Sequence, residues 1–296
     1  MSITIGTRGS KLALAQTSTV CKKLSALGIE TEQVIITTQG DTTTGVPLHE
    51  IGGQGVFVRA LDDAILAGQI DCAVHSMKDI PTFRPNGLIT AAVLKRDSPA
   101  DYLACNGSPD AVRVIGTSST RRRAQLLRHD PDISIKDLRG NVDTRIRKMA
   151  AGDFDAIVLA EAGLARLGIR IPGKRLPLET FVPAPNQGTI AVVSRTDPSL
   201  MEKLSHLDHS QTRTDVAVER AVMEQLGGGC FTPLGIYCHH GHLIAEVLSL
   251  DGTRTERIET DVESIEQARD IGRQLQEKAK DLIDDAYQKL GIRNDR

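Results

Sequence analysis

Tryptophan is absent from this chain, and aromatic residues as a whole are scarce, with three Tyr and five Phe among 296 residues. Proteins that bind single-stranded nucleic acids without sequence preference rely on aromatic side chains on which the bases stack. The composition therefore argues against such a surface. Hydrophobic residues nevertheless make up 40% of the chain, which is enough to bury the cores of one to three globular domains.

Three further absences concern the cellular setting. The five cysteines are dispersed and form no CxxC pair, a pattern typical of reduced thiols in a cytosolic protein. No apolar stretch approaches the roughly 20 residues that a membrane-spanning helix needs. The opening MSITIGTRGS also lacks the basic-then-apolar layout of a signal peptide. We therefore expect a cytoplasmic protein that binds no membrane.

The net charge is only −2, but the positive charge is concentrated in one segment. Residues 118–148 carry nine Lys or Arg against four Asp or Glu. Within GTSSTRRRAQ (116–125), three arginines stand where a helix begins, although each cation there costs roughly 0.3–1 kcal/mol against the helix dipole. Guanidinium groups bind carboxylates in a bidentate manner, so the cluster favours a ligand with several carboxylates. A solvated basic face and a nucleic-acid patch are the alternatives.

Two pairs of segments resemble each other along the chain. ITIGTRGSKLALAQ (3–16) matches RVIGTSSTRRRAQ (113–125), and AGQIDCAVHSMKDI (67–80) matches AGDFDAIVLAEAGL (151–164). Each pair reads as a strand with an adjoining helix. Chance similarity of such short units is the alternative, but two pairs in the same order favour two α/β lobes.

The lobes are expected to be joined by two crossing segments. RDSPADYLAC (96–105) is the first and VPAPNQGTIAVVSR (182–195) the second. Two crossings would form a hinge beside a cleft, which is a favoured ligand site in α/β proteins. The predicted domains are a discontinuous lobe one at 1–96 and 188–208, lobe two at 97–187, and a small C-terminal α+β domain at 211–296.

The C-terminal domain is expected to contain two helical regions. DVAVERAVMEQL (215–226) has the apolar spacing of a helix, and Gly227 to Gly229 would end it. A single long helix is predicted from Ile265 to Leu290, with Ser264 and Gln267 as its capping box. CHHGH (238–242) has metal-ligand spacing, but it also fits a hairpin turn at Gly241, and we expect no metal.

Two short motifs carry candidate chemistry. HSMKDIP (75–81) follows a buried-looking strand, so Lys78 and Asp79 would face the ligand crevice. Asp79 could stabilise a cationic intermediate or move protons, while an ordinary surface pair is the alternative. In GGGCFTP (227–233), Cys230 would be an accessible nucleophile if it lies near the cations, or else a small buried hydrophobic residue.

Six motifs occur in order over roughly 220 residues: IGTRGSKLALAQ, GGQGVFVRAL, AVHSMKD, GTSSTRR, LRGNVDTR and GGGC. Together they resemble the porphobilinogen deaminase, or hydroxymethylbilane synthase, family of tetrapyrrole biosynthesis. The resemblance implies a monomeric transferase whose first two domains are akin to the lobes of periplasmic binding proteins. It also implies head-to-tail condensation of four porphobilinogen molecules, with loss of ammonia, on a covalent dipyrromethane cofactor.

The resemblance also implies roles for individual residues. It places the cofactor thioether on Cys230 and the catalytic aspartate on Asp79, with Lys78 in the same site. The residues expected to hold the cofactor are Lys78, Asp79, Thr117, Ser118, Ser119, Arg121, Arg122, Arg139 and Arg145. The residues expected to hold substrate are Arg8, Ser10, Gln16, Phe57, Arg139, Arg145 and Gln187.

One stretch departs from the family, because relatives often carry lysine where this chain has Glu50 and Gln54. The ligand contacts of that stretch are therefore expected to be weaker or different. Two rival functions stay open. A cytosolic two-lobed binding or sensor module for a small polycarboxylate would need neither Cys230 nor Asp79. A nucleic-acid binder would use residues 118–148 and bind with a steep dependence on salt.

Overall fold

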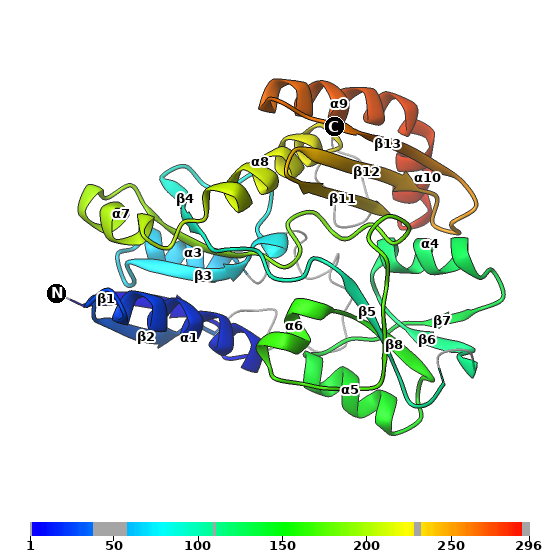
Figure 1. Cartoon of the computed structure of the whole chain (residues 1–296), viewed down its shortest axis with the longest axis horizontal. Coiled ribbons are helices and arrows are strands. Elements are labelled where there is room, and N and C mark those ends of the chain that lie inside the picture. Colours follow the sequence, from blue (N-terminus) through cyan, green and yellow to red (C-terminus); the bar gives the residue numbers. More distant parts are fainter. Residues whose placement is uncertain (1, 38–57, 109–110, 228–231, 292–296) are drawn as a thin grey trace. The chain divides into compact units, whose positions relative to one another are not determined.

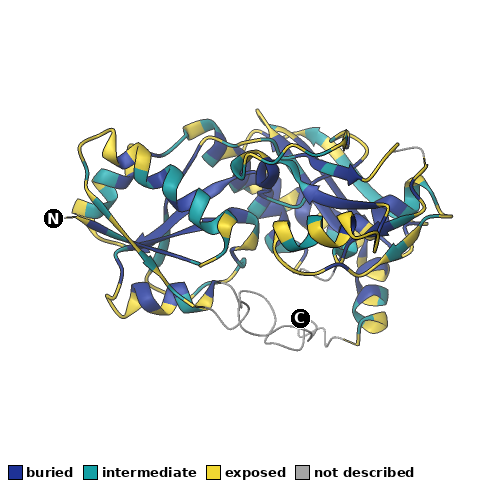
Figure 2. Ribbon diagram, turned by 90° about the horizontal axis from the view of Figure 1, so that it is seen from below, coloured by how far each residue is buried: buried dark blue, intermediate teal, exposed yellow. Residues whose placement is uncertain are grey.

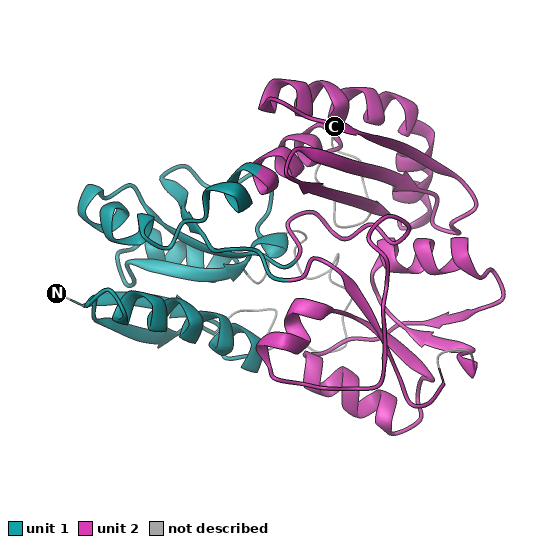
Figure 3. Ribbon diagram, in the orientation of Figure 1, with its two compact units in different colours: residues 1–97, 188–214 teal, residues 98–187, 215–296 magenta. Residues whose placement is uncertain are grey.

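The computed structural model describes residues 2–37, 58–108, 111–227 and 232–291 (Figure 1). The chain forms two compact units (Figure 3). Unit one comprises residues 1–97 and 188–214, and unit two comprises residues 98–187 and 215–296. Among the described residues, no helix combines the length and apolarity needed to cross a membrane.

Unit one is built on a five-stranded sheet in the order β2-β1-β3-β10-β4. Its strands are β1 (Ile3–Thr7), β2 (Thr31–Ile35), β3 (Cys72–Ser76), β4 (Leu88–Val93) and β10 (Ile190–Arg195). Its helices are α1 (Lys11–Ser25), α3 (Arg59–Leu66), the 3-10 helix η1 (Met77–Asp79) and α7 (Pro198–Ser205). β1, β2 and β3 run parallel, and β10 runs antiparallel between β3 and β4. The carboxyl ends of β1 to β4 therefore lie at one edge of the sheet.

Unit two contains a second sheet with the equivalent order, β7-β6-β8-β5-β9. Its strands are β5 (Asp101–Cys105), β6 (Val114–Gly116), β7 (Ser134–Lys136), β8 (Ala156–Ala160) and β9 (Gly173–Arg175), with helices α4 (Thr120–His129), α5 (Val142–Ala150) and α6 (Glu161–Arg166). Here β5 takes the antiparallel place that β10 takes in unit one. The predicted equivalence of the two segment pairs is confirmed, since β1 matches β6 and β3 matches β8 in position.

The rest of unit two is a three-stranded antiparallel sheet with helices. Its elements are α8 (Ser210–Gln225, which begins in the last residues of unit one), β11 (Leu234–His239), β12 (His242–Leu248), β13 (Thr255–Asp261), α9 (Ile265–Lys278) and α10 (Lys280–Lys289). The hairpin turn predicted at Gly241 is confirmed, with φ of 50° at His240 and 83° at Gly241. The predicted α/β class, with two lobes and a small C-terminal sheet-and-helix part, is thereby confirmed.

The prediction of one long helix from Ile265 to Leu290 is wrong, because the helix breaks at Ala279. Leu275, Ala279 and Ile283 all belong to one hydrophobic core, so the apolar stripe continues through the break. A straight helix of that length would measure roughly 39 Å, whereas a seven-residue strand spans roughly 23 Å. The break lets both halves pack on the same short sheet.

Burial follows the strands of each sheet, while exposed residues gather on the outer faces of the helices (Figure 2). In unit one the core packs Val20 and Leu24 of α1 against Ile5, Val74 and Val192 of the sheet. β8, with the sequence AIVLA, is buried along nearly its whole length. Such continuous apolar runs are expected of parallel strands that are covered on both faces.

Candidate functional site

The predicted catalytic pair of unit one lies at the carboxyl edge of its sheet. Lys78 and Asp79 form η1 directly after β3, and Arg8 follows β1. Because β1 and β3 are adjacent and parallel, with Ile5 opposite Cys72, both turns lie at the same edge. Asp79 is exposed and Lys78 is half-buried. This is the position at which open α/β sheets bind their ligands.

Helix α1 is fixed to this edge by side-chain hydrogen bonds. Ser10 caps the helix, its Oγ accepting from the backbone N–H of Ala13 at 3.3 Å. Gln16 is buried and donates from Nε2 to Oγ of Ser76, the last residue of β3, at 2.7 Å. The three residues Arg8, Ser10 and Gln16 that were predicted to hold substrate are thus brought to one edge with Lys78 and Asp79.

Sequence reasoning missed His75, which precedes this pair on β3. It is 5% exposed. Burial, followed by the positive charges of Arg84 and Arg8, lowers the pKa of His75 to about 3, so the ring is neutral near pH 7. Within the described part of the chain its Nε2 has no hydrogen-bond partner. The signal that could have identified it is a titratable residue inside an otherwise apolar strand.

In unit two, the turns after β6 and β7 are joined by Ser118. Its Oγ accepts from the backbone N–H of Leu138 at 3.0 Å and donates to the carbonyl oxygen of Leu138 at 3.1 Å. Ser119 caps α4, and the hydroxyl of buried Thr117 accepts from the N–H of Ser119 at 3.2 Å. The predicted residues Thr117, Ser118 and Ser119 therefore lie beside the turn that carries Arg139.

Arg139 and Arg145 belong to the same region of unit two. Arg139 is exposed in the turn after β7, and Arg145 lies in the first turns of α5. Nε of Arg145 donates to the carbonyl oxygen of Gly140 at 2.7 Å, which ties α5 to that turn. Together with the hydroxyl groups of 117–119, these two cations form a donor set suited to carboxylates.

Arg121 and Arg122 are buried against a carboxylate that sequence reasoning missed. Arg121 Nη2 lies 2.8 Å from Asp101 Oδ2, and Arg122 Nη2 lies 2.7 Å from Asp101 Oδ1. Gln187, predicted to contact substrate, donates to the same carboxylate at 3.0 Å. Arg121 and Arg122 also donate to the carbonyl oxygens of Val182 and Val158. Asp101 thus compensates for two of the three arginines at the start of α4.

The electrostatics of this cluster are dominated by the ion pairs. Burial by itself would raise the pKa of Asp101, but the two guanidinium groups outweigh it and hold that pKa well below its usual range. Burial lowers the pKa of Arg121, and Asp101 opposes that effect. A guanidinium has five N–H donors, of which described residues take two on Arg121 and three on Arg122. The predicted contacts of Arg121 and Arg122 with ligand stay predictions.

A second missed carboxylate, Glu219, joins three segments of unit two. It is fully buried on α8 and accepts from the backbone N–H groups of Asn186 at 2.5 Å and Cys238 at 2.8 Å. Asn186 has a φ of 64°, an uncommon value for a residue other than glycine. Glu219 therefore fixes the chain just before Gln187, and it does so from the helix that precedes the glycines at 227–229.

His242, the last histidine of CHHGH, is engaged with acidic side chains. Nδ1 of His242 lies 2.9 Å from Asp261 and its Nε2 lies 3.4 Å from Glu259, and these hydrogen bonds raise the pKa of His242. Across the described ranges, no group of three or more His, Cys, Asp or Glu side chains could hold a metal ion. The predicted residues Phe57 and Cys230 lie outside the described residues, as do Glu50 and Gln54.

Each α/β lobe thus places hydroxyl groups and cations at the carboxyl ends of its parallel strands, an arrangement that fits the class of α/β proteins whose ligands carry carboxylates. The sequence comparisons specify the family. Residues 3–203 match the porphobilinogen deaminase, dipyromethane cofactor binding domain, and residues 214–281 match the porphobilinogen deaminase, C-terminal domain. The chain belongs to the porphobilinogen deaminase family, as predicted from its six motifs.

Relatives from archaea and bacteria agree with this assignment. A protein of Methanosarcina acetivorans named probable porphobilinogen deaminase is 50% identical over 92% of this chain and 91% of its own length. One from Archaeoglobus fulgidus with the same name is 44% identical over 94% of this chain and 99% of its own. The porphobilinogen deaminase of Rubrobacter xylanophilus is 47% identical over 79% and 78%. The predicted enzyme class and the predicted dipyrromethane cofactor are confirmed at the level of the family.

A periplasmic substrate-binding protein of an ABC transporter from Coxiella burnetii is 14% identical, and the match covers 74% of this chain and 96% of that protein with a TM-score of 0.43.

Proposed function

We propose that this chain is a porphobilinogen deaminase that joins four porphobilinogen molecules head to tail into hydroxymethylbilane. In each addition the aminomethyl C–N bond of one porphobilinogen breaks and ammonia leaves. The freed carbon bonds to a pyrrole α-carbon, which loses its proton. After the fourth addition, water releases the chain and supplies the hydroxyl group of the product. The observation that carries the proposal is the match to the family's two domains over residues 3–203 and 214–281.

Asp79 is the proposed catalytic residue. When ammonia leaves, positive charge develops on the substrate, and an exposed carboxylate beside that charge stabilises it. The same carboxylate can accept the proton that the pyrrole carbon loses. Its place at the carboxyl end of β3, in the same turn as Lys78, supports this role. Lys78 is proposed to orient a carboxylate of the bound pyrroles.

The donor set of unit two fits an anionic cofactor, and we propose that Cys230 anchors it through a thioether. When bound, the dipyrromethane supplies the pyrrole carbon to which the next unit is joined. Thr117, Ser118, Ser119, Arg139 and Arg145 would hold its carboxylates. Arg121 and Arg122 are proposed to contribute those N–H donors that Asp101 and the backbone do not take.

Substrate recognition is assigned to both lobes. Arg8, Ser10 and Gln16 are proposed to bind the carboxylates of incoming porphobilinogen in unit one. Arg139, Arg145 and Gln187 are proposed to do so in unit two, and Phe57 to pack over the ring. Porphobilinogen carries two carboxylates and one ammonium, so every addition increases the negative charge that these cations neutralise. A covalent anchor keeps the product in place between additions, which makes each step effectively intramolecular.

We further propose that the enzyme is a cytoplasmic monomer that binds no nucleic acid. Its proposed domains are a discontinuous lobe one (1–96 and 188–208), a lobe two (97–187) and the C-terminal domain (211–296). The separate core of the three-stranded sheet supports the last division. A single symmetric peak at the monomer mass in sedimentation would agree, and a dimer at working concentration would not.

The test of function combines intact mass, the Ehrlich colour reaction for pyrroles and turnover of porphobilinogen. Wild type and Cys21→Ser, a control at a half-buried cysteine of α1, should carry an adduct and give colour. Cys230→Ser should lack both. Asp79→Asn should keep its fold and lose turnover. A wild-type protein that has the bare sequence mass and does not consume porphobilinogen would instead indicate a binding module.

A further inference from the structure

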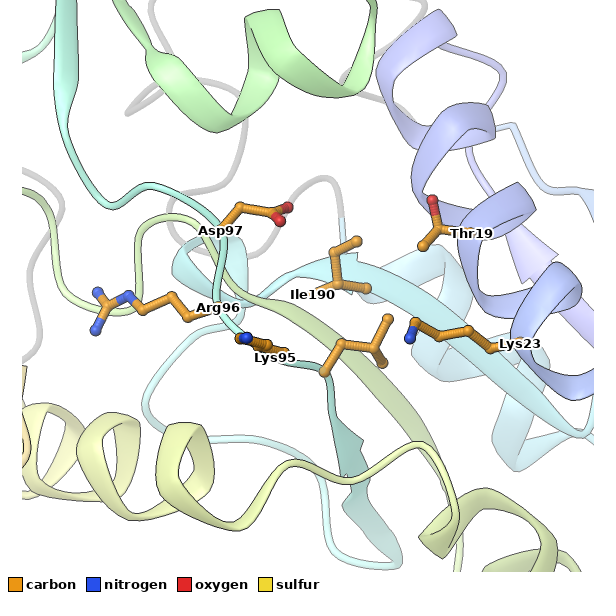
Figure 4. A pocket seen from close by; sticks show the side chains of 7 residues that line it. Thr19, Lys23, Lys95, Arg96, Asp97 and Ile190 are labelled. Atoms are coloured by element: carbon orange, nitrogen blue, oxygen red, sulfur yellow. The ribbon is translucent and has the colours of Figure 1, made fainter.

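A pocket of about 280 Å³ lies in unit one, and no role has been assigned to it above (Figure 4). One wall is α1, from which Lys23 projects. The opposite wall is the chain just after β4, with Lys95 and Asp97. Leu94 and Ile190, both buried, form an apolar floor. The remaining lining residues are Thr19 and Arg96.

The pocket adjoins the predicted catalytic edge of the same unit. Thr19 and Lys23 follow Gln16 by three and seven positions on α1, a spacing that puts all three on one face of the helix. Ile190 lies opposite Ser76 in the register of β10 and β3. Gln16 and Ser76 are joined by the 2.7 Å hydrogen bond described above. The face of α1 that lines the pocket is therefore also bonded to the last residue of β3, after which the turn with Lys78 and Asp79 begins.

The charges around the pocket are of both signs. Lys23 extends from α1 toward the opposite wall, which carries Lys95, and the carboxylate of Asp97 points from that wall toward α1 (Figure 4). All three side chains are exposed, so a ligand can reach them from solvent. The guanidinium of Arg96 points away from this space (Figure 4), which leaves two ammonium groups, one carboxylate and an apolar floor. These groups are complementary to a flat ring bearing two carboxylates and one ammonium.

Porphobilinogen has that combination of groups, because its pyrrole ring carries an acetate, a propionate and an aminomethyl group. We propose that the pocket is a holding site for a second porphobilinogen molecule, beside the one that reacts. The inference rests on the proposed function. The carboxylates of the held porphobilinogen pair with Lys23 and Lys95, and its ammonium pairs with Asp97. Its ring lies on Leu94 and Ile190. Such a site raises the local concentration of substrate next to the catalytic turn.

Equilibrium dialysis with an unreactive analogue tests this proposal. The analogue is porphobilinogen with a halogen on its free α-carbon and an aminoethyl group in place of the aminomethyl group, so it can neither accept a further unit nor lose ammonia to form a reactive methylene carbon. Wild-type holoenzyme should bind two equivalents, and Lys23→Gln/Lys95→Gln should bind one. The control is Lys22→Gln, because Lys22 is an exposed neighbour with the same charge but lies outside the pocket. The control should still bind two equivalents.

The same variants separate the possible outcomes kinetically. The double variant should raise KM severalfold with kcat unchanged, and Lys22→Gln should change neither. If every protein bound one equivalent of the analogue, or if the double variant still bound two, the holding site would be rejected. The proposed function would stand in that case, provided that the wild type still consumes porphobilinogen. A wild type that neither binds the analogue nor consumes porphobilinogen would instead reject the proposed function itself.

The role of Asp97 is tested with a second probe, a pyrrole dicarboxylate that lacks the aminomethyl group. Asp97→Asn should weaken binding of the halogenated analogue at the second site about threefold, the scale of an exposed ion pair. It should leave binding of the amine-free probe unchanged or slightly tighter. Equal weakening of both probes would show that Asp97 does not recognise the ammonium.

Discussion

At the scale of single residues, Asp101 determines how the cationic start of α4 is tolerated. It is fully buried between Arg121 and Arg122, and Gln187 donates a further hydrogen bond to it. Two arginines at a helix start would be unfavourable alone. A buried carboxylate that is fully hydrogen-bonded converts them into a fixed ion-pair cluster. The cluster also fixes Ser119, the helix cap, next to the proposed cofactor ligands.

Replacing Asp101 by Asn should be strongly destabilising. The change leaves two guanidinium groups buried without a counter-charge, which typically costs about 3–5 kcal/mol. Asp270→Asn, which removes an exposed i,i+3 partner of Arg273, is the control and should cost about 0.5 kcal/mol or less. Urea unfolding at pH 7 measures both. A loss below about 1 kcal/mol in Asp101→Asn would contradict the assigned role of the cluster.

The lowered pKa of Asp101 also makes the free energy of unfolding depend on pH. A carboxyl whose pKa is lower in the folded state stabilises the protein above its unfolded pKa, about 4. That contribution is lost as the pH falls below 4, because protonation then removes the ion pairs. In Asp101→Asn this part of the acid destabilisation should be missing from urea unfolding curves recorded between pH 4 and 2.

The lowered pKa of His75 predicts a second pH dependence of the free energy of unfolding, at higher pH. Its folded pKa of about 3 lies below the unfolded value, near 6.5, so the unfolded state binds the extra proton between these limits. The free energy of unfolding should fall as pH drops from 6.5, by at most about 1.4 kcal/mol per pH unit. His75→Gln should flatten this part of the curve in urea unfolding between pH 4 and 7.

His242 provides a control, because its effect on the pH dependence of the free energy of unfolding has the opposite sign. Its pKa is raised by Asp261 and Glu259, so its contribution is present below the unfolded pKa and is lost as pH rises through the folded one. His242→Gln should therefore change the slope in the direction opposite to His75→Gln. Parallel curves for wild type and His75→Gln would show that His75 does not titrate as a buried neutral ring.

At the scale of elements, the two twin lobes were predictable and their fourth strands were not. IGTRGS and IGTSST repeat visibly because a strand, a glycine turn and a capped helix are local features. The antiparallel insertion of β10 and β5 is a long-range pairing. Nothing in IAVVSR or DYLAC states between which strands each inserts or in which direction, since an apolar run is compatible with either direction.

The same division between local and long-range features applies to the candidate site. Ser10, Ser119 and the turn of Lys78 and Asp79 could be located from their own motifs. Asp101 and Glu219 could not, because their partners lie at least 19 positions away in the chain. A lone Asp before an apolar strand and a Glu within an amphipathic helix are ordinary patterns. Only the assembled fold shows that both carboxylates are buried.

A glycine in the turn between β12 and β13 fixes the C-terminal sheet to α4 within unit two. A Cβ on Gly252 would collide with the carbonyl oxygen of Ala124 and lie 2.7 Å from the backbone nitrogen of Arg128. Nearby, Nη1 of Arg128 lies 3.0 Å from the buried carboxylate of Glu246 on β12. The turn and this ion pair therefore hold the sheet against the helix that carries the arginine motif.

Gly252→Ala should cost more stability than Gly28→Ala. Both glycines have φ near 75°, so each substitution carries similar backbone strain, about 1 kcal/mol. The space around Gly28 is open, whereas Gly252→Ala must also displace α4, which should add about 1–3 kcal/mol. Denaturant unfolding of the two variants measures the difference. Equal losses would mean that the turn does not pack as closely as described.

At the scale of the whole molecule, an overall charge of −2 conceals a cationic segment that needs a counter-charge. Asp101 neutralises part of it, but Arg123, Arg139 and Arg147 are exposed. Like charges held this close repel, and the repulsion is reduced either by an anionic cofactor or by salt. Cofactor loss should therefore affect stability as well as activity.

Cys230→Ser, which should lack the cofactor, is expected to have a lower Tm than wild type at low salt. The difference should shrink in 1 M NaCl, where the Debye length is about 3 Å. Cys21→Ser serves as the control and should retain the wild-type salt dependence. Thermal unfolding at the two salt concentrations measures the effect. A Tm difference that does not depend on salt would indicate that charge neutralisation is not its cause.

The strand order of unit one has a consequence for how the chain matures on the ribosome. β4 ends at Val93 and pairs with β10, which begins at Ile190, while every strand of the β7-β6-β8-β5-β9 sheet is encoded between them. The later-encoded sheet can thus close first, and the N-terminal one waits with β4 unpaired for roughly 5–20 s at ordinary rates of translation. During that interval the nascent chain exposes an apolar strand edge that it must keep from neighbouring polypeptides.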